Sequence, residues 1–144
     1  ANRNQNEPTA EVSTEEFELV MVTNALGPMR VIESLQELVL EDGMIGVMSS
    51  GQVSVGTNTS GGHEVYRGSK AALNQYMRCY AARHTGEAPA LIIMAPGWVR
   101  TDLGGPDAPL SIEESIPKVV NVLVSQRGCR GLQYLDRQGN TVPW

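Results

Sequence analysis

The sequence lacks several features that mark particular classes of protein. Basic residues are in the minority, since 11 lysines and arginines stand against 16 aspartates and glutamates, and the formal net charge is -5. Nucleic-acid-binding proteins usually carry a basic footprint, so we expect no nucleic-acid partner. No apolar run approaches the ~20 residues that a membrane-spanning helix needs, so we expect no membrane partner either.

Cysteine and histidine are also scarce. The two cysteines, Cys79 and Cys129, form no CxxC pair, which favours reduced and mostly buried thiols. The two histidines, His63 and His84, do not have the spacing of a zinc-binding HExxH helix, so we expect no metal. Residues 1–8 lack the apolar stretch of a signal peptide, and a cytoplasmic location is our default expectation.

What is present is an alternation of helical and strand patterns. Hydrophobic residues make up 41% of the chain and charged residues 19%, as in a domain with a packed core. Ser-x-x-Glu capping boxes begin two helices, and short continuous apolar runs indicate strands buried on both faces. The predicted elements are helices over 13–40, 64–84 and 111–124, and strands over 44–48, 90–94 and 131–135.

This alternation predicts the α/β fold class, with a parallel sheet, right-handed crossovers and helices on the faces of the sheet. Ligands of such sheets bind beyond the carboxyl ends of the strands. Two loops leave those ends, over 49–63 and 95–110. The chemistry of the protein is therefore expected in these loops.

Tyr66 and Lys70 form the sharpest chemical signal. They stand four residues apart at the head of a predicted helix, so their side chains share one helical face. A free tyrosine titrates near ~10, and a nearby positive charge lowers that pKa. The pair therefore has the groups for proton transfer to or from an alcohol or carbonyl oxygen.

Other polar residues are predicted near this pair. Ser49 and Ser50 end the preceding strand, where a hydroxyl can hold a carbonyl or a developing alkoxide. Asn24 lies on the apolar stripe of the first helix and needs a polar partner there. Pro28 has no N–H for the Asn24 carbonyl, which predicts an irregular helix at this point.

The loop after the second strand offers a further candidate site. Its sequence runs Pro-Gly-Trp-Val-Arg-Thr over 96–101. The backbone of such a turn can bind a flat polar ligand, for example a carboxamide. A turn that merely ends the strand is the alternative.

These residues occur in the order found in the short-chain dehydrogenase/reductase family, which the sequence resembles over roughly 17–144. The segments 24–28, 69–74 and 96–102 also resemble the family's wording around the same positions. The sequence is most similar to the sniffer or C-factor type of carbonyl reductase. Proteins of that type have an Asn-Thr-x-Gly-Gly word between the serine and the tyrosine, here at 58–62.

The resemblance implies a Rossmann-like, doubly wound parallel sheet and hydride transfer between NAD or NADP and a carbonyl or alcohol. It implies that Tyr66 is the acid/base and that Lys70 lowers its pKa. Ser50 would orient the substrate oxygen, with Ser49 as the alternative, and Asn24 with a water would complete a proton relay. The residues implied in cofactor binding are Tyr66, Lys70, Pro96, Gly97, Val99 and Thr101.

The resemblance also implies that residues 1–144 are one partial domain, with three strands and three main helices, that lacks the family's glycine-rich N-terminal half. The residue that selects NAD or NADP belongs to that half. Apolar side chains on more than one face of the first two helices favour a homodimer or homotetramer. The alternative functions are an extended-type epimerase or dehydratase, which shares the YxxxK pattern, and a non-catalytic binding protein with the same fold.

Overall fold

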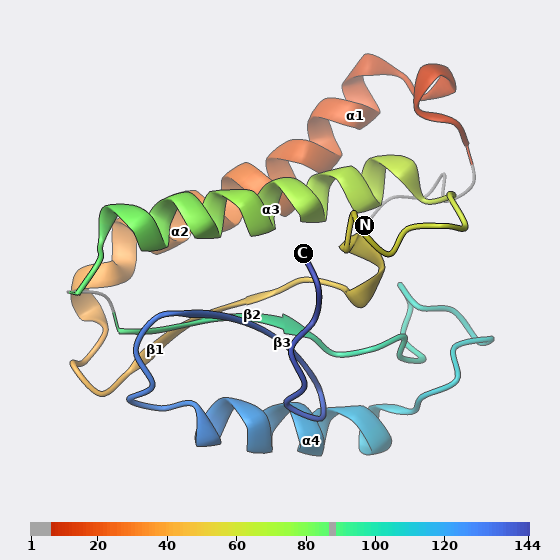
Figure 1. Ribbon diagram of the computed structural model, residues 1–144. Helices are drawn as coiled ribbons and strands as arrows, with labels where there is room; N and C mark the ends of the chain where they lie inside the picture. Colours follow the sequence, from red (N-terminus) through yellow and green to blue (C-terminus); the bar gives the residue numbers. More distant parts are fainter. Residues whose placement is uncertain (1–6, 87–88) are drawn as a thin grey trace.

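A three-stranded parallel sheet lies between two layers of helix in the computed structural model, which describes residues 7–86 and 89–144 (Figure 1). The strands are β1 (Met44–Met48), β2 (Ala90–Ala95) and β3 (Leu132–Asp136). Their order in the sheet is β1-β2-β3, and both pairings are parallel. The predicted fold class and strand positions are confirmed. All three carboxyl ends therefore lie at one edge of the sheet.

The central strand has the burial that its apolar sequence predicts. All six residues of β2 are buried, because β2 pairs on both sides and helices cover both of its faces. The prediction that a strand is buried on both faces is wrong for β1. Only Ile45 and Val47 of that strand are buried, and Met48 is 48% exposed. Within the described residues β1 pairs only with β2, so its outer edge is open.

The first predicted helix is continuous but not uniform. It consists of α1 (Thr14–Met21), a π-helical turn (Val22–Leu26), α2 (Gly27–Leu35) and a 3-10 turn (Gln36–Leu38). In the π turn the Gly27 N–H bonds to the Val22 carbonyl, five residues back. The irregularity predicted before Pro28 is thus a π turn. The predicted end near Leu40 is too late, because Val39 has an extended backbone.

The other two predicted helices are confirmed as α3 (Glu64–Arg83) and α4 (Ile112–Ser125). The capping box of α4 is complete: the Ser111 Oγ accepts from the Glu114 N–H at 3.2 Å, and the Glu114 carboxylate accepts from the Ser111 N–H at 2.7 Å. Of the first capping box, the Ser13 Oγ accepts from the Glu16 N–H at 3.2 Å.

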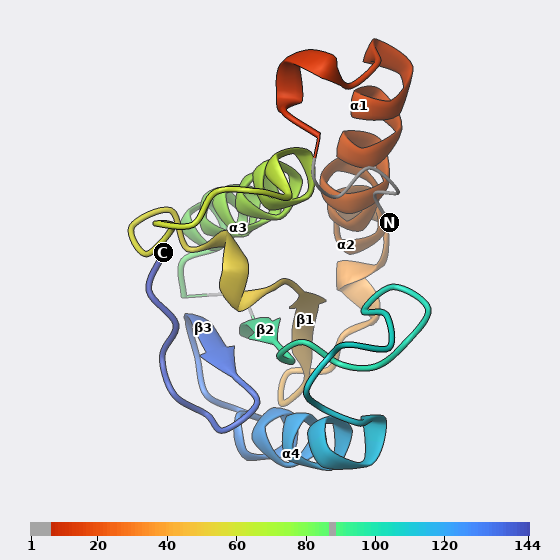
Figure 2. The ribbon, with the colours of Figure 1, turned by 90° about the vertical axis from the view of Figure 1, so that its right-hand side faces the viewer.

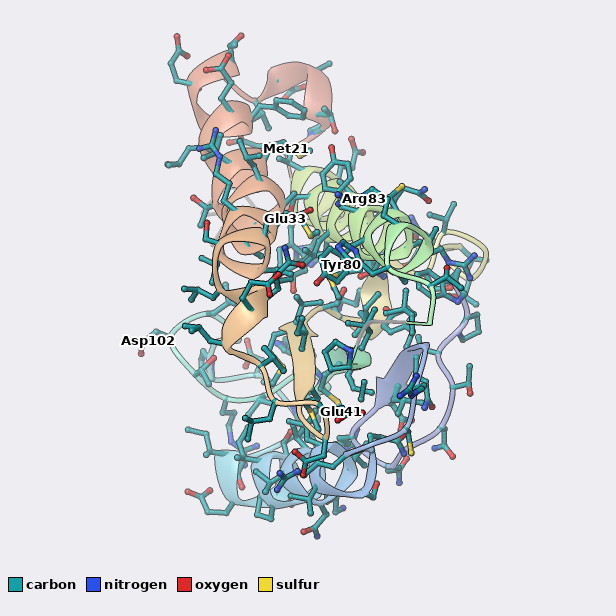
Figure 3. All side chains as sticks on the ribbon, turned by 90° about the vertical axis from the view of Figure 1, so that its left-hand side faces the viewer. Met21, Glu33, Glu41, Tyr80, Arg83 and Asp102 are labelled. Atoms are coloured by element: carbon teal, nitrogen blue, oxygen red, sulfur yellow. The ribbon has the colours of Figure 1, made fainter. Side chains whose placement is uncertain are left out.

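Helices α2 and α3 cover one face of the sheet and α4 covers the other, while α1 extends away from the sheet, as the nearly end-on view in Figure 2 shows. Glu33 of α2 and Arg83 of α3 form an ion pair where these two helices lie side by side (Figure 3). Both cysteines are free and exposed, so the prediction of mostly buried thiols is wrong. No helix in the described part of the chain has the length and apolar character needed to cross a membrane.

Candidate functional site

Tyr66 and Lys70 lie one turn apart at the head of α3, beside the carboxyl end of β1. The Lys70 Nζ donates a hydrogen bond of 2.8 Å to the carbonyl of Met48, the last residue of β1. Burial lowers the pKa of Lys70. An ammonium has three donors, so two remain for a ligand. The contact ties the helix to the strand end and aims the ammonium at the predicted edge of the sheet.

The surroundings of Tyr66 favour the protonated phenol. Burial raises the pKa of Tyr66, while the side chain of Ser50, as a hydrogen-bond partner, acts in the opposite direction. The sequence predicted a lowered pKa because of the Lys70 charge. In the described chain that ammonium is on the Met48 carbonyl, and it is not among the causes of the shift at Tyr66.

The structure distinguishes the two neighbouring serines. Ser49 is buried, and its Oγ donates to the Asn74 Oδ1 at 2.7 Å. Ser50 is only half-buried, and its side chain is the one that acts on Tyr66. The Ser50 Oγ also accepts from the Gln52 N–H at 3.2 Å, which begins the 3-10 turn Gly51–Val53. Ser50 is therefore the serine that faces the candidate acid/base.

Asn24 reaches the site indirectly. Its Nδ2 donates to the Ser69 Oγ at 3.0 Å, and the Ser69 Oγ donates to the Tyr66 carbonyl at 2.8 Å. Ser69 is fully buried, so the π turn and α3 are joined through a polar contact at a buried hydroxyl. The predicted polar partner of Asn24 is thus a side chain of α3, between Tyr66 and Lys70 in the sequence.

The loop over 96–101 is braced from two sides. The Pro96 carbonyl accepts from the Ser115 Oγ of α4 at 2.7 Å. Gly97 has a φ of 89°, and a Cβ there would stand 2.8 Å from the Leu110 Cδ1, so a side chain would be strained and would require Leu110 to shift. The Thr101 Oγ1 accepts from the Gly104 N–H at 3.1 Å. These contacts fix the loop at the carboxyl end of β2, next to the end of β1.

The loop between Ser50 and α3 is held by Arg67, to which the sequence reasoning gave no role. The Arg67 NH1 donates to the Gln52 carbonyl at 3.0 Å and to the Asn58 Oδ1 at 2.8 Å, and the NH2 donates to the Ser60 Oγ at 3.4 Å. Arg67 also lines a cavity of about 230 Å³ between this loop and α3. Its place beside Tyr66 was the only sequence signal available.

The sequence analysis also gave no role to Asn74 and Tyr134, which lie close to the candidate serines. Asn74 stands eight residues after Tyr66 and so shares its helical face, which was a usable signal. Tyr134 lies in β3, and its hydroxyl donates to the Ser50 carbonyl, 84 positions away in the sequence. Nothing local in the sequence indicates that contact. In the described residues no group of three His, Cys, Asp or Glu side chains is placed to hold a metal ion.

Comparison with known families decides what this geometry belongs to. Residues 1–119 match the model of a family described as enoyl-(acyl carrier protein) reductase, which is more than half of the chain. The chain belongs to the short-chain dehydrogenase/reductase family. The resemblance predicted from Asn24, Ser50, Tyr66 and Lys70 is thereby confirmed at the level of the family.

Individual relatives agree. C-signal of Myxococcus xanthus is 35% identical over 123 residues, which are 84% of this chain and 74% of C-signal. A chain described as a short-chain dehydrogenase/reductase from Burkholderia multivorans, solved with bound NADP, is 58% identical with a TM-score of 0.97. Carbonyl reductase Sniffer of D. melanogaster is 25% identical with a TM-score of 0.85. The predicted similarity to the sniffer or C-factor type is confirmed.

These matches differ in how much of each relative they include. The match includes 100% of this chain and 62% of the Burkholderia chain. For Sniffer the two shares are 97% and 62%. The chain thus spans less than two thirds of the length of both solved relatives.

Proposed function

We propose that this chain carries the catalytic residues of an NAD(P)-dependent oxidoreductase that transfers hydride between a nicotinamide and a carbonyl or alcohol. The observation that carries the proposal is the meeting of Tyr66, Ser50 and Lys70 at the carboxyl edge of a parallel sheet. Family membership and a relative solved with NADP support it.

Tyr66 is the proton donor in the reducing direction. Because burial raises its pKa, the phenol is held protonated and can give its proton to the oxygen of a carbonyl substrate. The Ser50 hydroxyl, which already interacts with Tyr66, holds the same oxygen. In the oxidising direction the phenolate of Tyr66 accepts the proton of the alcohol, and the Ser50 hydroxyl holds the alcohol oxygen. Asn24, joined to this helix through Ser69, holds the water that completes the proton relay.

The residues present fit a nicotinamide dinucleotide. A bound nicotinamide would supply or accept the hydride. Lys70 has two donors beyond the one on Met48, which suits the hydroxyl groups of a ribose. Pro96, Gly97, Val99 and Thr101 form the braced turn at the end of β2, on which the nicotinamide ring would lie. Both NAD and NADP remain compatible with these residues.

The further features of the proposal concern the whole protein. Residues 1–144 form part of one Rossmann-like domain whose glycine-rich half would complete the dinucleotide site. The substrate is a small carbonyl or alcohol compound, and the enzyme acts as a homodimer or homotetramer in the cytoplasm. The loops over 51–63 and 102–110 would set the substrate preference.

The test is oxidation of NADPH or NADH, followed by absorbance, with a panel of aldehydes and ketones and the complete enzyme. We expect turnover with at least one carbonyl. We expect Tyr66→Phe to lower kcat by roughly a hundredfold or more while cofactor affinity is nearly unchanged, because only the phenolic proton is removed. Tyr76→Phe, on the same helix but 43% exposed, is the control. Near-normal turnover of Tyr66→Phe would refute the role of Tyr66, and cofactor binding without turnover would favour the non-catalytic alternative.

A further inference from the structure

A buried polar cluster lies beneath Ser50 and has no part in the chemistry proposed above. It contains Ser49 after β1, Asn74 of α3 and Tyr134 of β3, whose exposed fractions are 5%, 5% and 2%. The Ser49 Oγ donates to the Asn74 Oδ1 at 2.7 Å, and the Tyr134 hydroxyl donates to the Ser50 carbonyl. Three elements that are distant in sequence thus meet at the backbone of the candidate serine.

The Tyr134 hydroxyl is not needed to fill the core. The ring packs edge-on against Trp144, with centroids 5.5 Å apart, and belongs to the main core cluster. A phenylalanine would fill the same volume without bringing a polar atom into the interior, where such an atom must be hydrogen-bonded. What the hydroxyl adds is therefore polar contact, with the Ser50 carbonyl and with the Asn74 and Ser49 side chains. Burial raises the pKa of Tyr134, and the side chains of Asn74 and Ser49 act in the opposite direction as hydrogen-bond partners.

The peptide that Tyr134 holds determines where Ser50 points. Ser50 has an extended backbone, with φ -152° and ψ 141°, and is immediately followed by the 3-10 turn Gly51–Val53. A shift of the Ser50 backbone would carry its Cα, and with it the Oγ, to a different place relative to Tyr66. The backbone on the N-terminal side of Ser50 is held as well. The Ser49 N–H donates to the Met94 carbonyl at 2.8 Å, and the Ser49 Oγ donates to the Asn74 Oδ1.

We propose that Tyr134 is a positioning residue, whose hydroxyl holds the Ser50 peptide so that the Ser50 side chain faces Tyr66. Ser49 and Asn74 brace the same backbone from the other side. This inference rests on the proposed function, because it gives Tyr134 an effect only through the role of Ser50. Misplacement of a reacting group by about 1 Å costs up to about a hundredfold in rate, so loss of one brace is expected to have a measurable effect.

The first experiment compares two buried tyrosines in the complete enzyme. Tyr134→Phe removes the hydroxyl from the Ser50 carbonyl. Tyr80→Phe is the matched control: Tyr80 is 1% exposed, and its hydroxyl donates to the Gln36 Oε1 at 2.7 Å near Glu33 and Arg83, away from the site (Figure 3). We expect Tyr134→Phe to lower kcat about tenfold without changing the KM for the cofactor. We expect Tyr80→Phe to lower Tm to a similar extent but to leave kcat within about twofold.

The second experiment asks whether the effect passes through Ser50. Both tyrosine variants are repeated in a Ser50→Ala background, which keeps the carbonyl but has no hydroxyl to misplace. A positioning role predicts that Tyr134→Phe causes no further loss of kcat there, so that the two substitutions are not additive. Ser49→Ala, which removes a brace without changing any ring, is expected to behave in the same way. The Ser49→Ala variant can therefore test the proposal even if Tyr134→Phe does not fold.

The outcomes separate this inference from the function on which it rests. The inference is overturned if Tyr134→Phe and Ser49→Ala affect kcat no more than Tyr80→Phe does. Equal losses in the two backgrounds also overturn it, because they indicate a general loss of structure. A complete enzyme that reduces no carbonyl, or a Ser50→Ala variant with full activity, would overturn the proposed function and this inference with it.

Discussion

At the scale of single residues, Tyr66 carries the proposed chemistry, and its environment sets its protonation. Burial raises its pKa, and Lys70, whose charge would lower that pKa, is directed at the Met48 carbonyl. The free chain is therefore arranged with the phenol as a proton donor.

The pH dependence of the phenol follows from this arrangement. A raised pKa keeps Tyr66 protonated through the neutral range, and the phenolate forms only above the ordinary tyrosine value of ~10. We expect phenolate absorbance that the cofactor-free enzyme shows and its Tyr66→Phe variant lacks to appear only in that alkaline range. Phenolate absorbance from Tyr66 near neutral pH, without cofactor, would contradict the prediction.

Adjacent residues show where sequence reasoning reached its limit. Ser49 and Ser50 are chemically identical, and pattern alone left both as candidates. Just beyond β1 the backbone directs their side chains to different partners, so Ser49 meets Asn74 while Ser50 meets Tyr66. The YxxxK pair needed only local helix geometry, and it was therefore predictable. The contact of Tyr134 with Ser50 depends on the pairing of β3 with β2, which no local pattern indicates.

At the scale of elements, periodicity predicted the strands and helices well, because each has a distinct apolar pattern and two helices have capping boxes. It failed where burial depends on neighbours. The sequence of β1 is as apolar as that of β2, but β1 is an edge strand in the described residues, so Met48 is exposed. The length of the first helix was overestimated because apolar residues continue past its end, through Val39 and Leu40.

At the same scale, the loop between Ser50 and α3 depends on Arg67 for its conformation. Arg67 makes three hydrogen bonds to this loop, so we expect its removal to free the wall of the proposed substrate site and to leave Tyr66 in place. We expect Arg67→Ala to raise the KM for carbonyl substrates by about tenfold, as for the loss of hydrogen bonds to a charged group, with a smaller change in kcat.

The control for this prediction is Arg127→Ala. Arg127 forms an exposed ion pair with Asp42 at 3.3 Å, at the opposite end of the sheet, and such pairs contribute about 1 kcal/mol or less to stability. Its kinetics should match the parent enzyme. Equal KM values for the parent and Arg67→Ala would show that the loop does not depend on Arg67.

At the scale of the whole molecule, exposed apolar side chains favour assembly. Leu19 of α1 is 66% exposed and Val31 of α2 is 58% exposed, and apolar patches on a helical face commonly mark an interface. We expect a homodimer or homotetramer in light scattering of the complete enzyme. Leu19→Glu with Val31→Glu should shift it toward monomer, whereas Val55→Glu, in a loop and 74% exposed, should not. A monomeric parent at micromolar concentration would contradict this prediction.

Because one side of the sheet is open, we expect dinucleotide binding to require further residues in addition to these 144. Within the described residues one edge of β1 has no partner strand, and an open apolar edge is an aggregation hazard. On the α4 side of the sheet, Ile112, Ile116, Val120 and Val124 are exposed at four-residue intervals. Residues 1–16 contain no glycine, whereas phosphate binding in such folds uses a glycine-rich turn at a helix N-terminus.

A preceding segment of roughly 80–100 residues, which would bring the domain to an ordinary size, would pair with β1, cover α4 and supply that turn. We expect the 144-residue chain to show no NADPH or NADH binding in fluorescence titration, and the chain extended by this segment to bind. Circular dichroism of both proteins checks whether the shorter one is folded. Tight binding by the folded 15.6 kDa chain would refute the prediction, because Lys70 and the turn after β2 would then be sufficient anchors.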